Sequence, residues 1–310
     1  MKPIPDVARE LGCSADECAA RLASGREKLL VARNRRMRPG RDEKVLTSWN
    51  ALMVRGMAHA ARVFGESSWL ASAQGALQFI RRTLWRDGRL LATSKDGRAH
   101  LNAYLDDYAF LLDALLELLQ GEFREEDLAL ARELAEVLLA QFEDRESGGF
   151  YFVSHDHETL IHRSKQGHDG ATPSGNGIAA HALQRLGHLT GEARYLDAAR
   201  RTLELFYPVL ERQPSACVSL LTALEEHLVP PQVVILRGAP EPIADWQRTL
   251  GRTCRPATLI LDIRSDAGRL PAALDKPTPA TAVNAWVCRG VSCLPPIGDR
   301  GELERVLSEG

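Results

Sequence analysis

The chain has 310 residues and a mass of 34.2 kDa, enough for one large domain or for a large domain joined to a small one. Hydrophobic residues make up 45% and charged residues 26%, so the chain can bury a sizeable core and general disorder is excluded. Its 39 basic and 41 acidic residues give a net charge of −2. This balance argues against nucleic acid as a partner, because such proteins concentrate basic charge on one face.

No apolar run approaches the roughly 18–20 residues that cross a membrane, and the first eleven residues lack the apolar core of a signal peptide. We therefore expect a cytoplasmic protein without a membrane partner. The six cysteines are too sparse for a disulfide scaffold and are expected to stay reduced. Cys288 and Cys293 do not have the spacing of a redox or zinc motif, which predicts a structural thiol pair.

Helical periodicity dominates from Ser14 to Leu228. Ser14 and Glu17 form a capping-box pattern that predicts a helix running towards Arg35. Seven further helices are predicted at Thr47–Phe64, Ser68–Leu84, Tyr104–Leu119, Glu125–Phe142, Ser174–Leu189, Glu192–Tyr207 and Ser215–Leu228. Short links join them in antiparallel pairs, which indicates the helical hairpins of an all-α toroid or bundle.

An internal repeat supports this organisation. The pattern Gly65-Glu66-x-x-Trp69-Leu70-x-x-Ala73 recurs from Gly191, and a weaker copy starts at Gly121, so the three starts lie 56 and 70 residues apart. The preceding helices carry a polar residue near their first turn, namely Asn50, Asp107 and Asn176, spaced 57 and 69 residues apart. The glycine-turn pattern and the polar residues recur at nearly the same interval, which predicts repeated helical hairpins.

The long connections, residues 85–103 and 143–173, contain short apolar runs separated by turn residues, which predicts β-hairpins on one rim. Binding and chemistry tend to lie on loops gathered at one face of a rigid scaffold. After Pro230 the pattern changes to strands at 232–237, 257–263 and 284–288 with helices at 243–250 and 300–307. We predict a toroid-type domain at residues 1–230 and a small α/β subdomain at residues 231–310. A dinucleotide fingerprint is missing, and no cofactor is predicted.

Three polar clusters lie where these loops enter helices, and each contains aromatic or amide side chains. Helix capping by Thr47 or Ser48, Asp106 and Ser174 is one interpretation. Aromatic rings beside amides and carboxylates are also typical of sugar sites, where the ring stacks on the sugar and polar groups bind its hydroxyls. On that interpretation the residues that bind a small sugar-like ligand are Asp42, Lys44, Trp49, Asn50, Tyr104, Tyr108, Ser174 and Asn176.

The candidate catalytic residues are Asp106, Asp107, His168 and Asp169. Adjacent carboxyls can raise one another's pKa and supply an acid or a base, although on a helix at most one of Asp106 and Asp107 would face the ligand. His168 would act as a base oriented by Asp169, and a solvated loop histidine is the alternative. The alternating histidines at 155, 157 and 162 fit a strand rim better than a metal site, so no metal is predicted.

Four runs of sequence carry a family resemblance: RPGRDEKVLTSWNALM, YLDDYAFLLDALLEL, GGFYFVSHDHETLIHRSKQGHDGATPSGN and AWVCRGVSCLPPI. Together they resemble the C-terminal portion of the YyaL-like, spermatogenesis-associated thioredoxin-domain proteins. The resemblance implies an (α/α)6 toroid similar to the N-acylglucosamine 2-epimerase and six-hairpin glycosidase folds. Eight predicted helices, where a closed toroid has twelve, imply an incomplete toroid. The sequence has no C-x-x-C and no thioredoxin-like segment, so the resemblance implies no redox function.

The resemblance leaves the reaction unassigned. One hypothesis is a carbohydrate-binding or carbohydrate-processing funnel, either epimerase-like with His168 moving a proton or glycosidase-like with Asp106 or Asp107 and Asp169 as acid and base. The alternative is a non-catalytic scaffold that partners a separate thioredoxin-like half or associates with itself over an uncovered toroid face. A truncated, inactive relative is the third reading.

Overall fold

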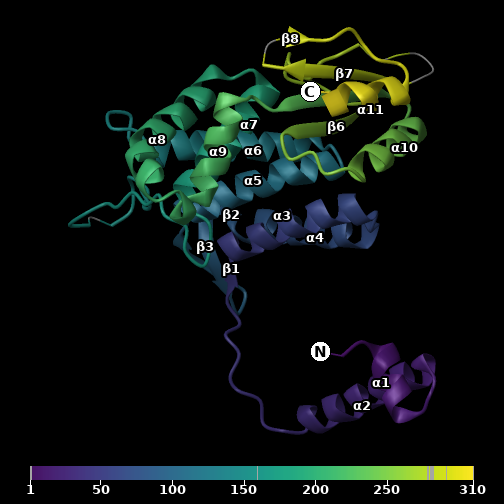
Figure 1. The fold of residues 1–310 in the computed structure, drawn as a ribbon. Helices are drawn as coiled ribbons and strands as arrows, with labels where there is room; N and C mark the ends of the chain where they lie inside the picture. Colours follow the sequence, from purple (N-terminus) through teal and green to yellow (C-terminus); the bar gives the residue numbers. More distant parts are fainter. Residues whose placement is uncertain (1, 159, 278, 280–282, 291, 310) are drawn as a thin grey trace. The chain divides into compact units, whose positions relative to one another are not determined.

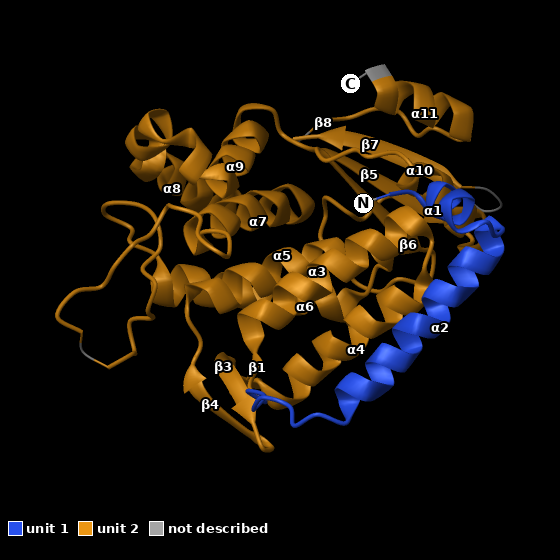
Figure 2. Cartoon of the chain, turned by 60° about the horizontal axis from the view of Figure 1, so that its bottom comes forward, with its two compact units in different colours: residues 1–43 blue, residues 44–310 orange. Residues whose placement is uncertain are grey.

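The computed structural model describes residues 2–158, 160–277, 279, 283–290 and 292–309 (Figure 1). The chain divides into two compact units, residues 1–43 and residues 44–310, which Figure 2 colours separately.

The first unit consists of two helices, α1 (Ile4–Leu11) and α2 (Ala15–Asn34). The hydroxyl of Ser14 accepts a hydrogen bond from the backbone N–H of Glu17 at 3.1 Å, which confirms the predicted start of α2. Helix α1 was not predicted from periodicity, because it is only eight residues long. Pro3 precedes it and Pro5 lies in its first turn, where the missing N–H costs nothing.

The helices of the second unit confirm the predicted helical hairpins. They are α3 (Thr47–Phe64), α4 (Ser67–Thr83), α5 (Leu105–Gly121), α6 (Glu125–Val137), α7 (Gly175–Thr190), α8 (Ala193–Arg212) and α9 (Val218–Leu228). A π-helical turn, Leu138–Phe142, continues α6, and a 3-10 turn, Pro214–Ala216, precedes α9. Helix α8 passes through Pro208 and ends five residues later than predicted.

Helices α3, α5, α7 and α9 lie side by side in that order, and α4, α6 and α8 each pack on the preceding member of this row (Figure 1). Helix α5 is the centre of the core, since every residue from Asp107 to Gln120 is buried. It is apolar almost all round, as expected of a helix covered on every side. The four helices of the row therefore share one hydrophobic core.

One of the two expected β-hairpins is confirmed. Strand β3 (Arg89–Lys95) pairs antiparallel with β4 (Arg98–Asn102), with β2 (Trp85–Arg86) and with β1 (Val45–Leu46). The hairpin predicted within residues 143–173 is wrong for the residues that the structure describes, which form only an isolated bridge between Glu143 and Phe150. The reason is that a side chain, Asn176, takes both backbone groups of Phe150. Thr159, part of that prediction, lies outside the described residues.

The change at Pro230 leads into a sheet with strand order β6-β5-β7-β8, as predicted for the α/β part. Its elements are β5 (Gln232–Gly238), α10 (Pro240–Gly251), β6 (Thr258–Arg264), β7 (Asn284–Arg289), β8 (Ser292–Cys293) and α11 (Arg300–Glu309). One face of the sheet, including Val233 and Leu261, joins the helical core, and the other face packs on α10 and α11. A domain boundary at residue 230 remains a prediction.

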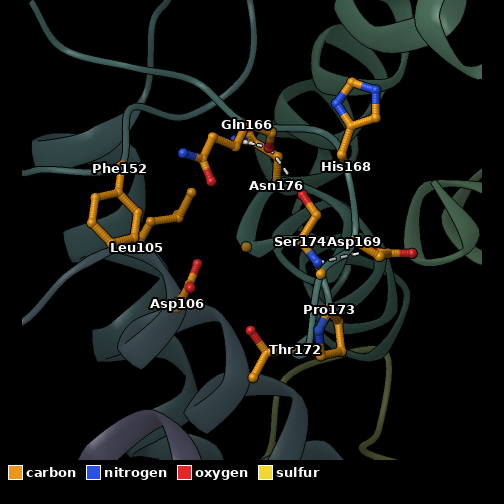
Figure 3. Close-up of a pocket in the computed structure, with 12 residues that line it drawn as sticks. Leu105, Asp106, Phe152, Gln166, His168, Asp169, Thr172, Pro173, Ser174 and Asn176 are labelled. Atoms are coloured by element: carbon orange, nitrogen blue, oxygen red, sulfur yellow. Dashed lines mark hydrogen bonds between the residues drawn. The ribbon is translucent and has the colours of Figure 1, made fainter. Parts of the chain in front are cut away.

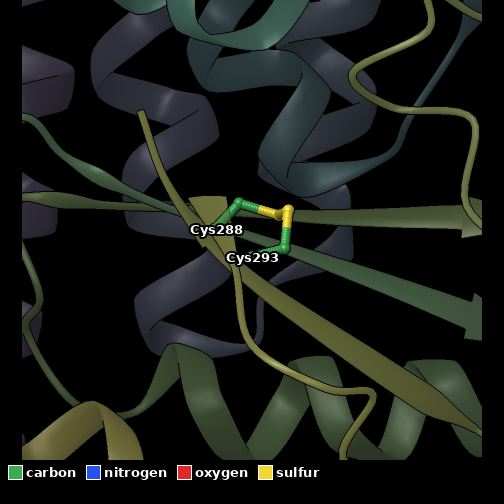
Figure 4. The surroundings of a disulfide bond; sticks show 2 residues. All are labelled: Cys288 and Cys293. Atoms are coloured by element: carbon green, nitrogen blue, oxygen red, sulfur yellow. A yellow bond between two sulfur atoms is a disulfide. The ribbon is translucent and has the colours of Figure 1, made fainter. Parts of the chain in front are cut away.

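Cys288 and Cys293 form a disulfide (Figure 4), so the expectation that all six cysteines are reduced is wrong for this pair. The two residues face each other across the antiparallel strands β7 and β8, with their Cα atoms 4.0 Å apart. This register brings the two sulfurs together. The other cysteines, at 13, 18, 217 and 254, are free. Among the described residues, no helix is both long enough and apolar enough to cross a membrane.

Candidate functional site

Two carboxylates tie together the N-terminal ends of the helix row. Asp107 Oδ1 accepts a hydrogen bond from the N–H of Ser48, at the start of α3, at 2.8 Å. Its Oδ2 accepts one from the N–H of Tyr104, at the start of α5, at 2.9 Å. Burial raises the pKa of Asp107 to about 6, while the two N–H donors act to lower it. Both oxygens of this candidate acid are therefore occupied by backbone.

Asp169 is the second of these carboxylates, and it joins the starts of α7 and α9. Its carboxylate accepts hydrogen bonds from the N–H of Ser174 at 2.8 Å, from the N–H of Ser219 at 2.9 Å and from the Ser219 hydroxyl. Ser174 in turn caps α7 by accepting from the N–H of Gly177 at 3.3 Å, and its hydroxyl donates to the carbonyl of Gln166. Helix starts have unpaired N–H groups, and these side chains satisfy several of them.

Between the starts of α5 and α7 lies a cavity of about 170 Å³, called here the helix-start cavity, which is lined by Asp106, Phe152, Gln166, Ser174 and Gly175 among others (Figure 3). The carboxyl of Asp106 points into it and has no hydrogen-bond partner among the described residues. Burial raises the pKa of Asp106 to about 6. Gly175 is needed opposite, because a Cβ there would lie 2.2 Å from Asp106 Oδ1.

Two other predicted residues line this cavity in different ways. His168 is exposed, and its ring points away from Asp106 (Figure 3). Asn176 is buried, and its amide is fully used: Oδ1 accepts from the N–H of Phe150 at 2.7 Å, and Nδ2 donates to the carbonyls of Phe150 and Gln166, both at 3.0 Å. The structure therefore brings Asp106, His168, Asp169, Ser174 and Asn176 to one place but leaves Asp106 as the uncommitted carboxyl.

The predicted aromatic residues do not share one cavity. Tyr104 stacks on Phe152, with ring centroids 5.0 Å apart and an interplanar angle of 11°. Tyr108 is buried, and its hydroxyl accepts a hydrogen bond from the N–H of Leu90 at 2.8 Å. Trp49 is 64% exposed, and its ring is open to a partner.

The remaining predicted residues lie at the start of α3 or before it. The side chain of Asn50 donates to the carbonyl of Leu46 at 2.8 Å, a bond within its own helix start. Asp42 is exposed and belongs to the first unit, whereas Lys44, also exposed, begins the second. Binding roles for these residues remain predictions.

A second cavity, of about 400 Å³, was not expected from the sequence. This inner cavity is lined by Arg55 of α3, Asp113 of α5, His181 of α7, and Ser219 and Thr222 of α9. It shares the loop at 169–173 with the helix-start cavity. Asp113 Oδ2 pairs with Arg55 Nε at 2.6 Å, and its Oδ1 lies 3.6 Å from Nδ1 of His181.

The ion pairs continue behind this cavity. His181 Nε2 lies 3.4 Å from Oε1 of Glu226, and Oε2 of Glu226 accepts from Nε of Arg185 at 2.9 Å. Burial acts to raise the pKa values of Asp113 and Glu226, but their cationic partners outweigh it and lower both to about 2. Burial acts to lower the pKa of His181, yet the two carboxylates raise it above its ordinary value.

One sequence signal could have revealed this network. Asp113 and Glu117 interrupt the apolar α5 at helical spacing, and His181 and Arg185 do the same in α7. Charged residues four apart on an otherwise apolar helix mark one face that meets charged partners. Among the described residues, no three His, Cys, Asp or Glu side chains are grouped so that they could hold a metal ion.

The fold and cavities define a mainly helical protein of repeated hairpins with polar cavities beside one row of helices. No family model matches the sequence. Human spermatogenesis-associated protein 20 is 32% identical over 97% of this chain, which confirms the family resemblance predicted from the motifs. The match covers 41% of the human protein, so the chain spans about two fifths of that relative's length.

Solved structures of sugar enzymes overlap with part of the chain. Cellobiose 2-epimerase from Spirochaeta thermophila is 22% identical, with a TM-score of 0.44 over 54% of this chain and 44% of that one. A GH76 α-mannanase from Bacteroides thetaiotaomicron is 11% identical, with a TM-score of 0.47 over 60% of this chain and 53% of that one.

Proposed function

We propose that the chain binds a small sugar-like ligand at the N-terminal ends of its helix row, as part of a carbohydrate-binding or carbohydrate-processing protein whose reaction is unassigned. The observation that carries the proposal is the carboxyl of Asp106, which points into the helix-start cavity without a hydrogen-bond partner among the described residues. A partly buried polar group without a partner is costly unless a ligand or solvent satisfies it.

The chemistry of this cavity suits a sugar. With a pKa of about 6, Asp106 is mostly ionised at neutral pH and can accept hydrogen bonds from two hydroxyls. The ring of Phe152, held by its stack on Tyr104, supplies an apolar face for the C–H side of a sugar ring. A carboxyl with a pKa near 6 is also suited to give or take a proton at neutral pH.

One observation favours the alternative of a binding module without catalysis. The carboxylates of Asp107 and Asp169, two of the candidate acids, accept hydrogen bonds from backbone N–H groups at helix starts. Of the predicted catalytic carboxyls, only Asp106 therefore remains open to a ligand. In that version the protein is a cytoplasmic scaffold whose partner is a separate thioredoxin-like protein or a second copy of the chain.

The test is calorimetric titration and thermal shift with a panel of neutral mono- and disaccharides, followed by NMR of each bound sugar to detect conversion. We expect at least one sugar to raise Tm, and Asp106→Asn to weaken its binding at least tenfold. Asp197→Asn, an exposed carboxyl on α8, is the matched control and should bind as the wild type does. The proposal fails if no sugar binds or if Asp106→Asn binds equally well. Binding without conversion would favour the binding module.

A further inference from the structure

The inner cavity presents charged groups that the helix-start cavity does not use. Arg55 has a side chain that is 42% exposed, whereas the side chains of Asp113 and His181 are 4% exposed and still line the cavity. Three helices, α3, α5 and α7, each supply one of the three. Placing ionised groups at a buried wall is costly unless each has a partner.

His181 has a carboxylate beside each of its two ring nitrogens. Its Nδ1 lies 3.6 Å from Asp113, beyond hydrogen-bond distance, and its buried Nε2 has no hydrogen-bond partner although Glu226 lies 3.4 Å away. The two carboxylates favour the imidazolium form, in which both nitrogens are donors. Nδ1 lies on the side of Asp113, which lines the cavity, whereas Nε2 faces Glu226 behind it, so Nδ1 is the donor that a ligand oxygen can reach.

The charges that line the inner cavity are of both signs. Arg55 is positive and Asp113 and Asp169 are negative, while the carboxylates beside His181 favour its positive form. Behind them Glu226 and Arg185 continue the alternation and hold His181 in place. An anionic or cationic ligand would upset this balance in a partly buried site, whereas an uncharged one would not.

We propose that the inner cavity is a second binding site, for an uncharged polyhydroxylated compound such as a neutral sugar ring. His181 donates to a ligand oxygen, Asp113 accepts from a ligand hydroxyl, and Arg55 closes the exposed side. This inference rests on the proposed function only for its class of ligand, because its residues and its cavity are different.

Calorimetric titration with a neutral hexose and with the corresponding hexuronate tests the site in His181→Gln. His59→Gln is the matched control, because His59 lies on α3, contacts Glu117 and does not line the inner cavity. We expect His181→Gln to lower hexose affinity at least tenfold, His59→Gln to leave it unchanged, and hexuronate to bind the wild type more weakly than hexose. Equal affinity in His181→Gln and the wild type, or tighter binding of hexuronate, would overturn the proposal.

Asp106→Asn separates the two cavities. If Asp106→Asn loses hexose affinity and His181→Gln does not, the proposed function is supported and the inner site is overturned. If His181→Gln loses affinity and Asp106→Asn does not, the inner site is supported and binding in the helix-start cavity is overturned. If the wild type binds no hexose, both proposals are overturned. If circular dichroism shows that His181→Gln does not fold, Arg55→Gln decides in its place, because its more exposed side chain is easier to replace. A tenfold loss supports the inner site, and unchanged affinity overturns it.

Discussion

Asp107 accepts a hydrogen bond from the backbone N–H of Ser48 at 2.8 Å, across 59 positions of sequence, and so joins the start of α3 to the start of α5. Its other oxygen holds the start of its own helix. Asp107→Asn replaces one acceptor by an N–H₂ group that faces an N–H donor. Because hydrogen bonds to a charged, buried group contribute about 1.5–3 kcal/mol, we expect the free energy of unfolding in urea to fall by about 1–3 kcal/mol.

Asp106, the preceding residue, provides the control for the Asp107→Asn prediction. Asp106→Asn removes a carboxyl that has no hydrogen-bond partner among the described residues, so we expect a change in unfolding free energy within about 0.5 kcal/mol, or a gain. Equal losses in the two variants would contradict the structural role given to Asp107.

The pH dependence of the Asp106→Asn effect has a definite sign. Burial raises the folded-state pKa of Asp106 from 3.8 to about 6, so between about pH 4 and pH 6 the unfolded chain holds fewer protons and stability falls as pH rises. The asparagine variant lacks this loss. Its stability relative to the wild type should therefore increase from pH 4 to pH 6.5 and then level off, as measured by urea unfolding at each pH. A constant difference would count against the raised pKa.

For Glu226 the expected dependence of stability on pH has the opposite sign. Its partners Arg185 and His181 lower its pKa from 4.5 to about 2, so its stabilising effect is present above about pH 4.5 and is lost as pH falls towards 2. Breaking a buried ion pair by removing one charge costs about 3–5 kcal/mol. Glu226→Gln should therefore be strongly destabilised at pH 7 and approach the wild type near pH 2.5. An effect independent of pH would show that packing, and not charge, is responsible.

Much of the helix row was predictable, because its signals are local. The spaced marks Asn50, Asp107 and Asn176 do fall at the starts of α3, α5 and α7. Their sequence pattern did not reveal that two of them bind backbone of a different segment, since Ser48 and Phe150 are distant in sequence. Local pattern finds a helix start, but only the fold decides which groups remain open to a ligand.

The inner cavity was missed for the same reason. Arg55, Asp113, His181 and Glu226 lie on four different helices, and no two of them are close in sequence. The sequence predicts the site at the polar loops, because loops often carry functional residues. The charged residues that line the inner cavity lie on helix faces, and in the sequence they are visible only as interruptions of an apolar pattern.

Gly175 lets Asp106 approach the start of α7. A Cβ at this position would lie 2.2 Å from Asp106 Oδ1 and 3.0 Å from Cγ of Leu105, so Gly175→Ala must displace the carboxyl from the helix-start cavity. We expect this variant to lose sugar affinity at least tenfold in calorimetric titration while it keeps its helical circular dichroism. Gly75→Ala, at an exposed position of α4 where a Cβ meets nothing within 4 Å, is the control and should bind normally. Full affinity in Gly175→Ala would argue that the Asp106 carboxyl does not contact the ligand.

The disulfide between Cys288 and Cys293 gives a prediction that is independent of any ligand. Four thiols should react in denaturant without reductant, and all six should react after reduction. Because the closed loop is short, the lost loop entropy predicts a stabilisation of only about 2 kcal/mol. Cys288→Ser with Cys293→Ser should lower the unfolding free energy by about that amount, whereas Cys254→Ser, at an exposed free cysteine, should not change it. Six reactive thiols in the unreduced protein would contradict the disulfide.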